Sequence, residues 1–79
     1  MYSIGDLITT GNNEKYMIFS KVVYQDLYYY HIIGYDPLKN DINGVSKIVK
    51  IDENDHLELV NDRKELALVL PLFSDFYTN

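Results

Sequence analysis

Short apolar segments alternate with polar turns at intervals of about ten residues along the chain. Residues 4–10 alternate between apolar and polar positions and run into the turn Gly-Asn-Asn-Glu, whose residue types tolerate positive φ. The later segments are rich in β-branched and aromatic residues, which favour strands. The pattern predicts five strands, near residues 4–10, 15–24, 28–35, 45–52 and 56–60.

The two faces of the longer strands follow from the same alternation. In residues 15–24 we assign the even-numbered positions to the core, because Lys21 on the opposite face belongs in solvent. In residues 28–35 alternation places one set toward the core, namely Tyr28, Tyr30, Ile32 and Gly34. The other face then carries Tyr29, His31, Ile33 and Tyr35. A one-residue slip would exchange these faces, and a bulge at Ser20 or Gly34 would do so locally.

The third predicted strand ends at Asp36-Pro37, because Pro37 has no N–H to donate to a ladder. Residues 36–44 are then expected to form a loop of nine residues that closes at Asn43-Gly44. Such a loop is longer than the usual connection in a small domain, which makes it the first loop to inspect for function.

A short helix is predicted near residues 62–70. Asp62 followed three residues later by Glu65 resembles a capping box, in which the first residue caps the helix. An apolar stripe at helical spacing follows, made of Leu66, Val69, Leu70 and Phe73. Pro71 should end the helix, which leaves residues 71–79 as a C-terminal tail.

These elements predict a mainly β protein in which residues 1–79 form a single small domain. About five antiparallel strands would form a small SH3-like barrel or a curled sheet, with one short C-terminal helix. A chain of 79 residues is near the lower limit for a stable unstapled core, so folding uses most of its apolar residues.

Composition excludes several functions. The chain has no cysteine, which excludes disulfides and thiolate metal sites, and its net charge of −5 opposes binding to nucleic acid or anionic lipid. No apolar run approaches the length of a membrane span, and the N-terminus lacks the pattern of a signal peptide. We therefore expect a cytoplasmic protein that binds neither nucleic acid nor membrane and carries no cofactor.

The stretch Tyr-Tyr-Tyr-His-Ile-Ile-Gly-Tyr at residues 28–35 is the most unusual in the sequence. Aromatic residues on a strand can stack on single-stranded nucleic acid, but that device also needs neighbouring Lys or Arg, and Gln25, Asp26 and Asp36 flank this run instead. The run is mainly structural in our interpretation, and any surplus aromatic surface would contact a protein partner.

Metal binding and catalysis have little support in the sequence. Asp41, Asn43 and Gly44 match half of a calcium-loop pattern, but lysines stand at two of its ligand positions. His31 and His56 are the only histidines, and no nucleophile, metalloprotease or phosphate-loop motif is present. We expect a protein that is not an enzyme and that holds no metal.

The sequence therefore predicts a non-catalytic accessory module that binds a protein, which could be a second copy of itself. Apolar residues on both faces of the tyrosine strand and in the C-terminal segment motivate this hypothesis. The candidate contact residues are Tyr29, His31, Tyr35, Leu72, Phe76 and Tyr77. The alternative is an acidic inhibitor or immunity protein directed at a basic or nucleic-acid-binding target. It would present Asp52, Glu53, Asp55 and Glu58.

Two partial resemblances complete the sequence evidence. The opening Ile-Gly-Asp-Leu-Ile at 4–8, Gly11 and Lys-Tyr-Met-Ile at 15–18 resemble a small uncharacterised family of low-GC Gram-positive bacteria, some of them encoded near type VII secretion genes. Tyr30, Gly34, Tyr35 and Pro37 loosely follow later positions of that family. The second half, from Lys50 to Val60 and through Leu-Pro-Leu-Phe, is similar to other short acidic Gram-positive proteins. The resemblance implies a bacterial, phage or mobile-element accessory protein and assigns no functional residue.

Overall fold

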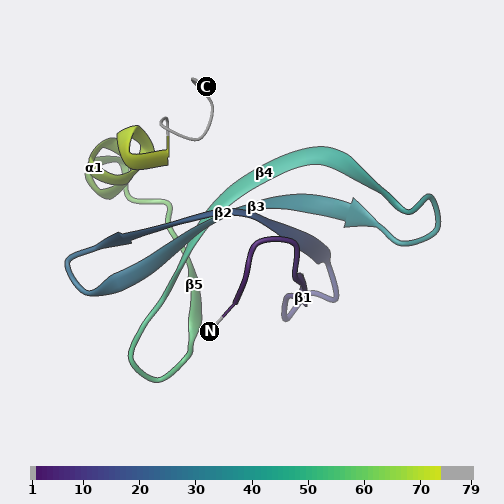
Figure 1. The fold of residues 1–79 in the computed structure, drawn as a ribbon, viewed down its shortest axis with the longest axis horizontal. Coiled ribbons are helices and arrows are strands. Elements are labelled where there is room, and N and C mark those ends of the chain that lie inside the picture. The colour runs from purple at the N-terminus through teal and green to yellow at the C-terminus, as the bar shows by residue number, and fades with distance from the viewer. Residues whose placement is uncertain (1, 74–79) are drawn as a thin grey trace.

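The protein is a curled antiparallel sheet with one helix outside the curl (Figure 1), as seen in a computed structural model that describes residues 2–73. Its elements are β1 (Leu7–Thr9), β2 (Lys15–Tyr24), β3 (Leu27–Asp36), β4 (Asp41–Ile51), β5 (Leu57–Leu59) and α1 (Arg63–Phe73). The strands pair in sequence order, so β1 and β5 are the two edges of an open half-barrel. The expectation of a mainly β curled sheet with a C-terminal helix is confirmed.

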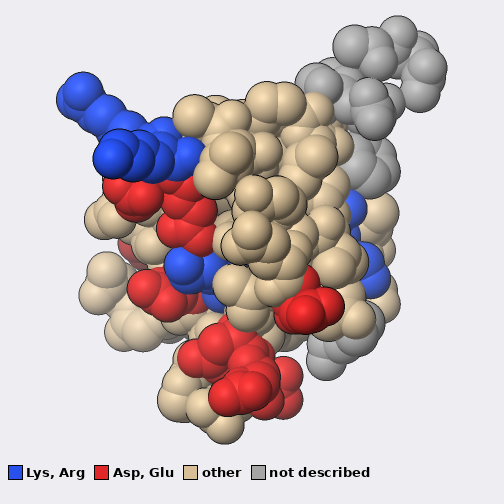
Figure 2. Space-filling view, turned by 90° about the vertical axis from the view of Figure 1, so that its left-hand side faces the viewer, with Lys and Arg blue, Asp and Glu red and all other residues tan. Residues whose placement is uncertain are grey.

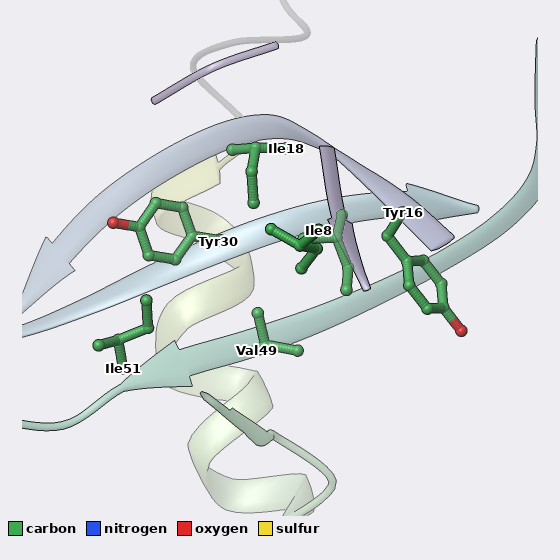
Figure 3. Packing of buried hydrophobic residues seen from close by; sticks show 7 residues of the cluster. Ile8, Tyr16, Ile18, Tyr30, Val49 and Ile51 are labelled. Carbon is green, nitrogen blue, oxygen red and sulfur yellow. The ribbon is translucent and has the colours of Figure 1, made fainter. Parts of the chain in front are cut away.

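The inner face of the curl holds the larger apolar cluster. Its buried members come from β1 to β4: Ile8, Tyr16, Ile18, Tyr30, Ile32, Val49 and Ile51. Figure 3 shows the side chains of this cluster gathered between the curled strands. Tyr30 is fully buried and its ring meets that of Tyr2 edge to face, with the centroids 5.9 Å apart. The predicted inward orientation of Tyr30 and Ile32 is confirmed.

A second cluster lies on the outer face of the sheet, beneath α1. Its buried residues are Tyr29, Val60, Val69 and Phe73, and partly buried residues pack around them. The sheet is therefore apolar on both faces, and two different devices cover them: the curl of the sheet inside and the helix outside.

A register shift in β2 supplies apolar residues to both faces. The pairing with β3 shifts between Ile18 and Ser20, so Tyr16 and Ile18 lie inside the curl, whereas Val22 and Tyr24 pack in the cluster beneath α1. The expectation that all even-numbered residues of 15–24 face one core was wrong. An extra residue in one strand of an antiparallel pair exchanges the faces beyond it. A second register shift occurs between Ile33 and Tyr35, around Gly34. Both positions that the sequence suggested for a bulge, Ser20 and Gly34, therefore lie at a register shift.

The loop expected at residues 36–44 is mostly strand. β3 continues to Asp36 and β4 begins at Asp41, so only four residues turn between them. The carboxylate of Asp36 accepts a hydrogen bond from the Leu38 amide at 3.0 Å, and Asn40 adopts a φ of 51°, which together close a tight turn. The residues that resemble part of a calcium loop therefore lie within β4, in a stretch where Gly44 has a φ of 85° and the pairing with β3 shifts.

Helix α1 begins as predicted and ends later than predicted. The Asp62 carboxylate accepts the Glu65 amide at 3.1 Å, which confirms the N-terminal cap. The helix continues through Pro71 to Phe73 because a proline in the last turn removes only one backbone hydrogen bond, and Phe73 is buried against the sheet. No helix within residues 2–73 has the length and apolar character needed to cross a membrane.

Packing of α1 predicts an asymmetry between two neighbouring helix residues. Val69 is fully buried, so Val69→Ala should lower the free energy of unfolding by about 2 kcal/mol. Leu68 is 56% exposed, so Leu68→Ala should change it by less than about 0.5 kcal/mol. Urea unfolding followed by circular dichroism measures both, and equal effects would contradict this packing of α1.

Candidate functional site

Apolar side chains on the outer face of the sheet extend beyond the area that α1 covers. Leu7 pairs with Met17 and Met17 pairs with Ile33, and side chains of directly paired residues project from the same face. Leu7, Met17, Tyr35 and Ile42 also line one hollow of about 420 Å³. Phe19 lies in the register shift of β2, and its ring contact with His31 places it beside this face. We call the following set the outer-face patch: Leu7, Met17, Phe19, Ile33, Tyr35 and Ile42.

The outer-face patch is exposed and uncharged. Leu7 is 54% exposed, Phe19 43% and Ile42 47%, while the other three members are partly buried. None of the six is an acidic or basic residue, and Asp41 lines the same hollow at its edge on β4. A continuous apolar surface of several large side chains is a feature of interaction sites more than of free monomer surfaces.

The patch exists because the helix is shorter than the strands beneath it. An α-helix of 11 residues is about 16 Å long, whereas a strand of 10 residues spans about 33 Å. Figure 1 shows α1 over one end of the sheet and the β3–β4 hairpin extending from the other end. Within residues 2–73, helix cover is therefore available for only part of the outer face.

His31 marks the boundary between the helix-covered area and the patch. Its ring meets the Phe19 ring at 5.4 Å and the Phe73 ring at 6.3 Å, both edge to face. Its Nε2 atom also makes a hydrogen bond with the Ser46 hydroxyl. Burial lowers the pKa of His31 from its usual value of 6.5, so the ring is neutral at pH 7.

The structure separates the six contact residues that the sequence predicted. Tyr29 is only 3% exposed because α1 packs over it, so the expectation of an exposed contact residue was wrong there. His31 is half-buried, Tyr35 lies in the patch with its hydroxyl donating to the Asn40 side chain, and Leu72 is 37% exposed. The remaining two lie outside the described residues: Phe76 and Tyr77.

Sequence reasoning missed the role of Glu65. Its carboxylate accepts hydrogen bonds from the Tyr29 hydroxyl at 2.7 Å and from the Lys50 ammonium at 2.8 Å, which join α1 to β3 and β4. The bond from Lys50, and then the bond from Tyr29, lower the pKa of Glu65. Burial of the Tyr29 hydroxyl raises its pKa to about 12, and the hydrogen bond to the negatively charged Glu65 carboxylate adds to this effect. The capping pattern showed a helix start but carried no sign of this cross-element contact.

The contact between Ser46 and His31 was also invisible in the sequence. The two residues are fifteen positions apart, and they meet because Ser46 pairs with Ile33 on the neighbouring strand. They line a groove of about 650 Å³ between α1 and the sheet, together with apolar residues that include the 47% exposed Leu70. Packed between two phenylalanine rings, His31 serves to seat the last turn of α1 on the sheet.

Acidic side chains gather at the opposite end of the sheet from the β3–β4 hairpin. Asp26, Asp52, Glu53 and Asp55 line one hollow of about 210 Å³ with Tyr28. Figure 2 shows the acidic side chains of the β4–β5 turn projecting at the bottom of the molecule.

Two of the acidic residues named from the sequence differ in their surroundings. The carboxylate of Asp52 accepts the backbone amides of His56 at 3.1 Å and Asn54 at 2.8 Å, and these bonds lower the pKa of Asp52. Glu58 pairs with Lys50 on β4 and does not line the acidic hollow. Residues 2–73 contain no group of three or more His, Asp or Glu side chains placed to hold a metal ion.

Comparison of the whole chain with protein-family models, curated proteins and solved structures found no match in any of the three.

The Glu65 contacts predict an acid-dependent contribution to stability. Because the folded state lowers the pKa of Glu65, ionised Glu65 stabilises the fold at every pH above its usual pKa of 4.5. This stabilisation is lost as the pH falls through the lowered pKa. Glu65→Gln should cost about 1 kcal/mol at pH 7 and should reduce the loss of stability on acidification. Urea unfolding at pH 7 and pH 3 tests this, with Glu53→Gln in the exposed turn as the control that should keep the wild-type pH dependence.

Burial of neutral His31 predicts a second pH dependence. A lowered histidine pKa gives stability that is complete above pH 6.5 and falls below it, because the unfolded chain binds the proton more tightly. His31→Gln should flatten the decline between about pH 7 and pH 5. His56 lies 3.6 Å from the Asp52 carboxylate, so His56→Gln is measured alongside His31→Gln to separate the contributions of the two histidines. An unchanged slope in His31→Gln, measured by urea midpoints, would refute this assignment.

Proposed function

We propose that this protein is a non-catalytic binding module that contacts a protein partner through the outer-face patch. The observation that carries the proposal is the extent of uncharged, exposed apolar surface next to the end of α1. The partner should present an apolar surface of its own, since the patch offers no charge for a charged partner to pair with.

The position of the patch supports a rigid contact surface. Its members come from β1 to β4, and backbone pairing fixes their relative positions. Large apolar and aromatic side chains held on a sheet lose little conformational entropy on binding. Phe73 and His31 adjoin the patch through Phe19, so the last turn of α1 lies beside the patch.

An acidic inhibitor is the second candidate, favoured by the gathering of Asp26, Asp52, Glu53 and Asp55 around one hollow. Such a surface would attract a basic target, and its affinity would fall steeply as salt screens the charges. The two candidates use different ends of the sheet and predict opposite responses to salt. They can therefore be separated in one experiment.

The experiment compares three versions of the full chain as bait in a Gram-positive lysate, with quantification of each captured protein. The versions are the wild type, Phe19→Ser/Ile42→Ser for the patch, and Glu53→Gln/Asp55→Asn for the acidic end. Light scattering over a range of concentrations tests a second copy as the partner. The patch variant should reduce capture or self-association by at least about tenfold, with little difference between about 0.05 and 0.3 M salt.

The controls decide between the candidates. Urea unfolding must first show that each version is folded under the assay conditions, because Phe19 and Ile42 are only 43% and 47% exposed and Phe19 also contacts His31. Capture that disappears in moderate salt and in the acidic-end variant would favour the inhibitor instead. If the patch variant retains every partner and the wild-type oligomeric state, the proposed function is incorrect.

A further inference from the structure

The half-barrel is open on the side where its two edge strands face each other. β1 and β5 each pair with one neighbour only, and residues of both strands line the same hollow of about 310 Å³. Ile8 and Thr9 contribute from β1, and Leu57 and Leu59 contribute from β5. This hollow lies inside the curl, so it is separate from the outer-face patch.

The backbone of β5 directs hydrogen-bonding groups toward this open side. In an antiparallel pair, directly opposite residues alternate between those that exchange backbone hydrogen bonds and those that do not. Val60 donates its amide to the Ile48 carbonyl, and Asp52 donates to the His56 carbonyl. Glu58 therefore bonds to Lys50, whereas the N–H and C=O groups of Leu57 and Leu59 point away from β4. No strand within residues 2–73 pairs with that edge.

The hollow beside this edge has an apolar floor. Ile8, Ile32 and Val49 form part of it. Ile8 lies on the edge strand β1, Ile32 on β3, and Val49 on β4 next to β5. Polar groups at the rim include Lys47 and Glu14. Leu57 and Leu59 both line the hollow, and Leu59 also lines the groove beside α1.

We propose that the hollow receives an extended polypeptide segment of a partner, which pairs with β5 as a sixth strand. Alternate side chains of that segment would enter the hollow, so the segment should carry apolar residues at every second position. An α-helix cannot use this edge, because its own backbone groups are already paired internally. The three-residue edge offers few hydrogen bonds, so burial in the hollow supplies much of the affinity.

A library of random twelve-residue peptides displayed on phage is the probe, selected on the full chain. Selected peptides are then synthesised, and their affinities are measured for Leu59→Pro and Leu59→Ala. Both variants lose the leucine side chain, but only proline removes the N–H that points away from β4, and an outward position on an edge strand tolerates proline. Leu59→Pro should bind at least about tenfold more weakly than Leu59→Ala.

Two further measurements test the same edge. Amide exchange followed by NMR on the wild type should slow at Leu57 and Leu59 when a selected peptide is added, and this readout needs no variant to fold. Leu68→Ala, on the exposed side of α1 and outside the hollow, should leave affinity near the wild-type value. Phe19→Ser/Ile42→Ser should do the same, since the outer-face patch lies on the other side of the sheet.

The outcomes separate this inference from the proposed function. Peptides with alternating apolar residues, sensitive to Leu59→Pro and protecting the two leucine amides, support a strand site at β5. A selection that yields no binder would overturn it. Binders that lose affinity equally with Leu59→Pro and Leu59→Ala would overturn it as well. Binders that respond only to the patch variant would also overturn it, and that result would strengthen the outer-face patch alone.

Discussion

The register shift between Ile18 and Ser20 is the constraint on which the rest of the structure depends. It lets one strand place Tyr16 and Ile18 inside the curl and Val22 beneath α1, so both faces of the sheet gain apolar partners. Without the extra residue, Val22 would lie on the same face as Ile18, and the helix would lose part of its support. The bulge thus divides a small supply of apolar residues between two clusters.

Helix α1 needs contacts with the sheet in addition to its own backbone hydrogen bonds, because a helix of 11 residues is only marginally stable by itself. Glu65 provides such contacts by joining the Tyr29 hydroxyl and the Lys50 ammonium from two adjacent strands. The carboxylate is only partly buried, so its desolvation cost is moderate, and Tyr29 gains a partner for a hydroxyl held near the core. At the far end of the helix, Phe73 and His31 complete the contact.

The short helix and the open sheet leave two apolar surfaces uncovered within residues 2–73. The helix is too short to cover the outer face, which leaves the outer-face patch, and the sheet does not close, which leaves the edge of β5 beside an apolar hollow. The two surfaces lie on opposite sides of the sheet and expose different groups. The patch exposes apolar side chains, whereas the edge exposes backbone N–H and C=O groups of β5. Under the two proposals, one small domain contacts a folded apolar surface with the first and an extended segment with the second.

The sequence by itself determined the number and approximate positions of the strands, the helix start and the inward orientation of Tyr30 and Ile32, because these depend on local propensity and on alternation within one segment. It did not determine the turn between β3 and β4, where strand pairing extends to Asp36 and Asp41. Tertiary structure alone decided that Tyr29 is buried, that the helix passes Pro71, and that Glu65 and Ser46 meet partners on other strands. Each of these depends on register between segments and on packing against a neighbouring layer. Such contacts join residues far apart in the chain, so no pattern within a single segment records them.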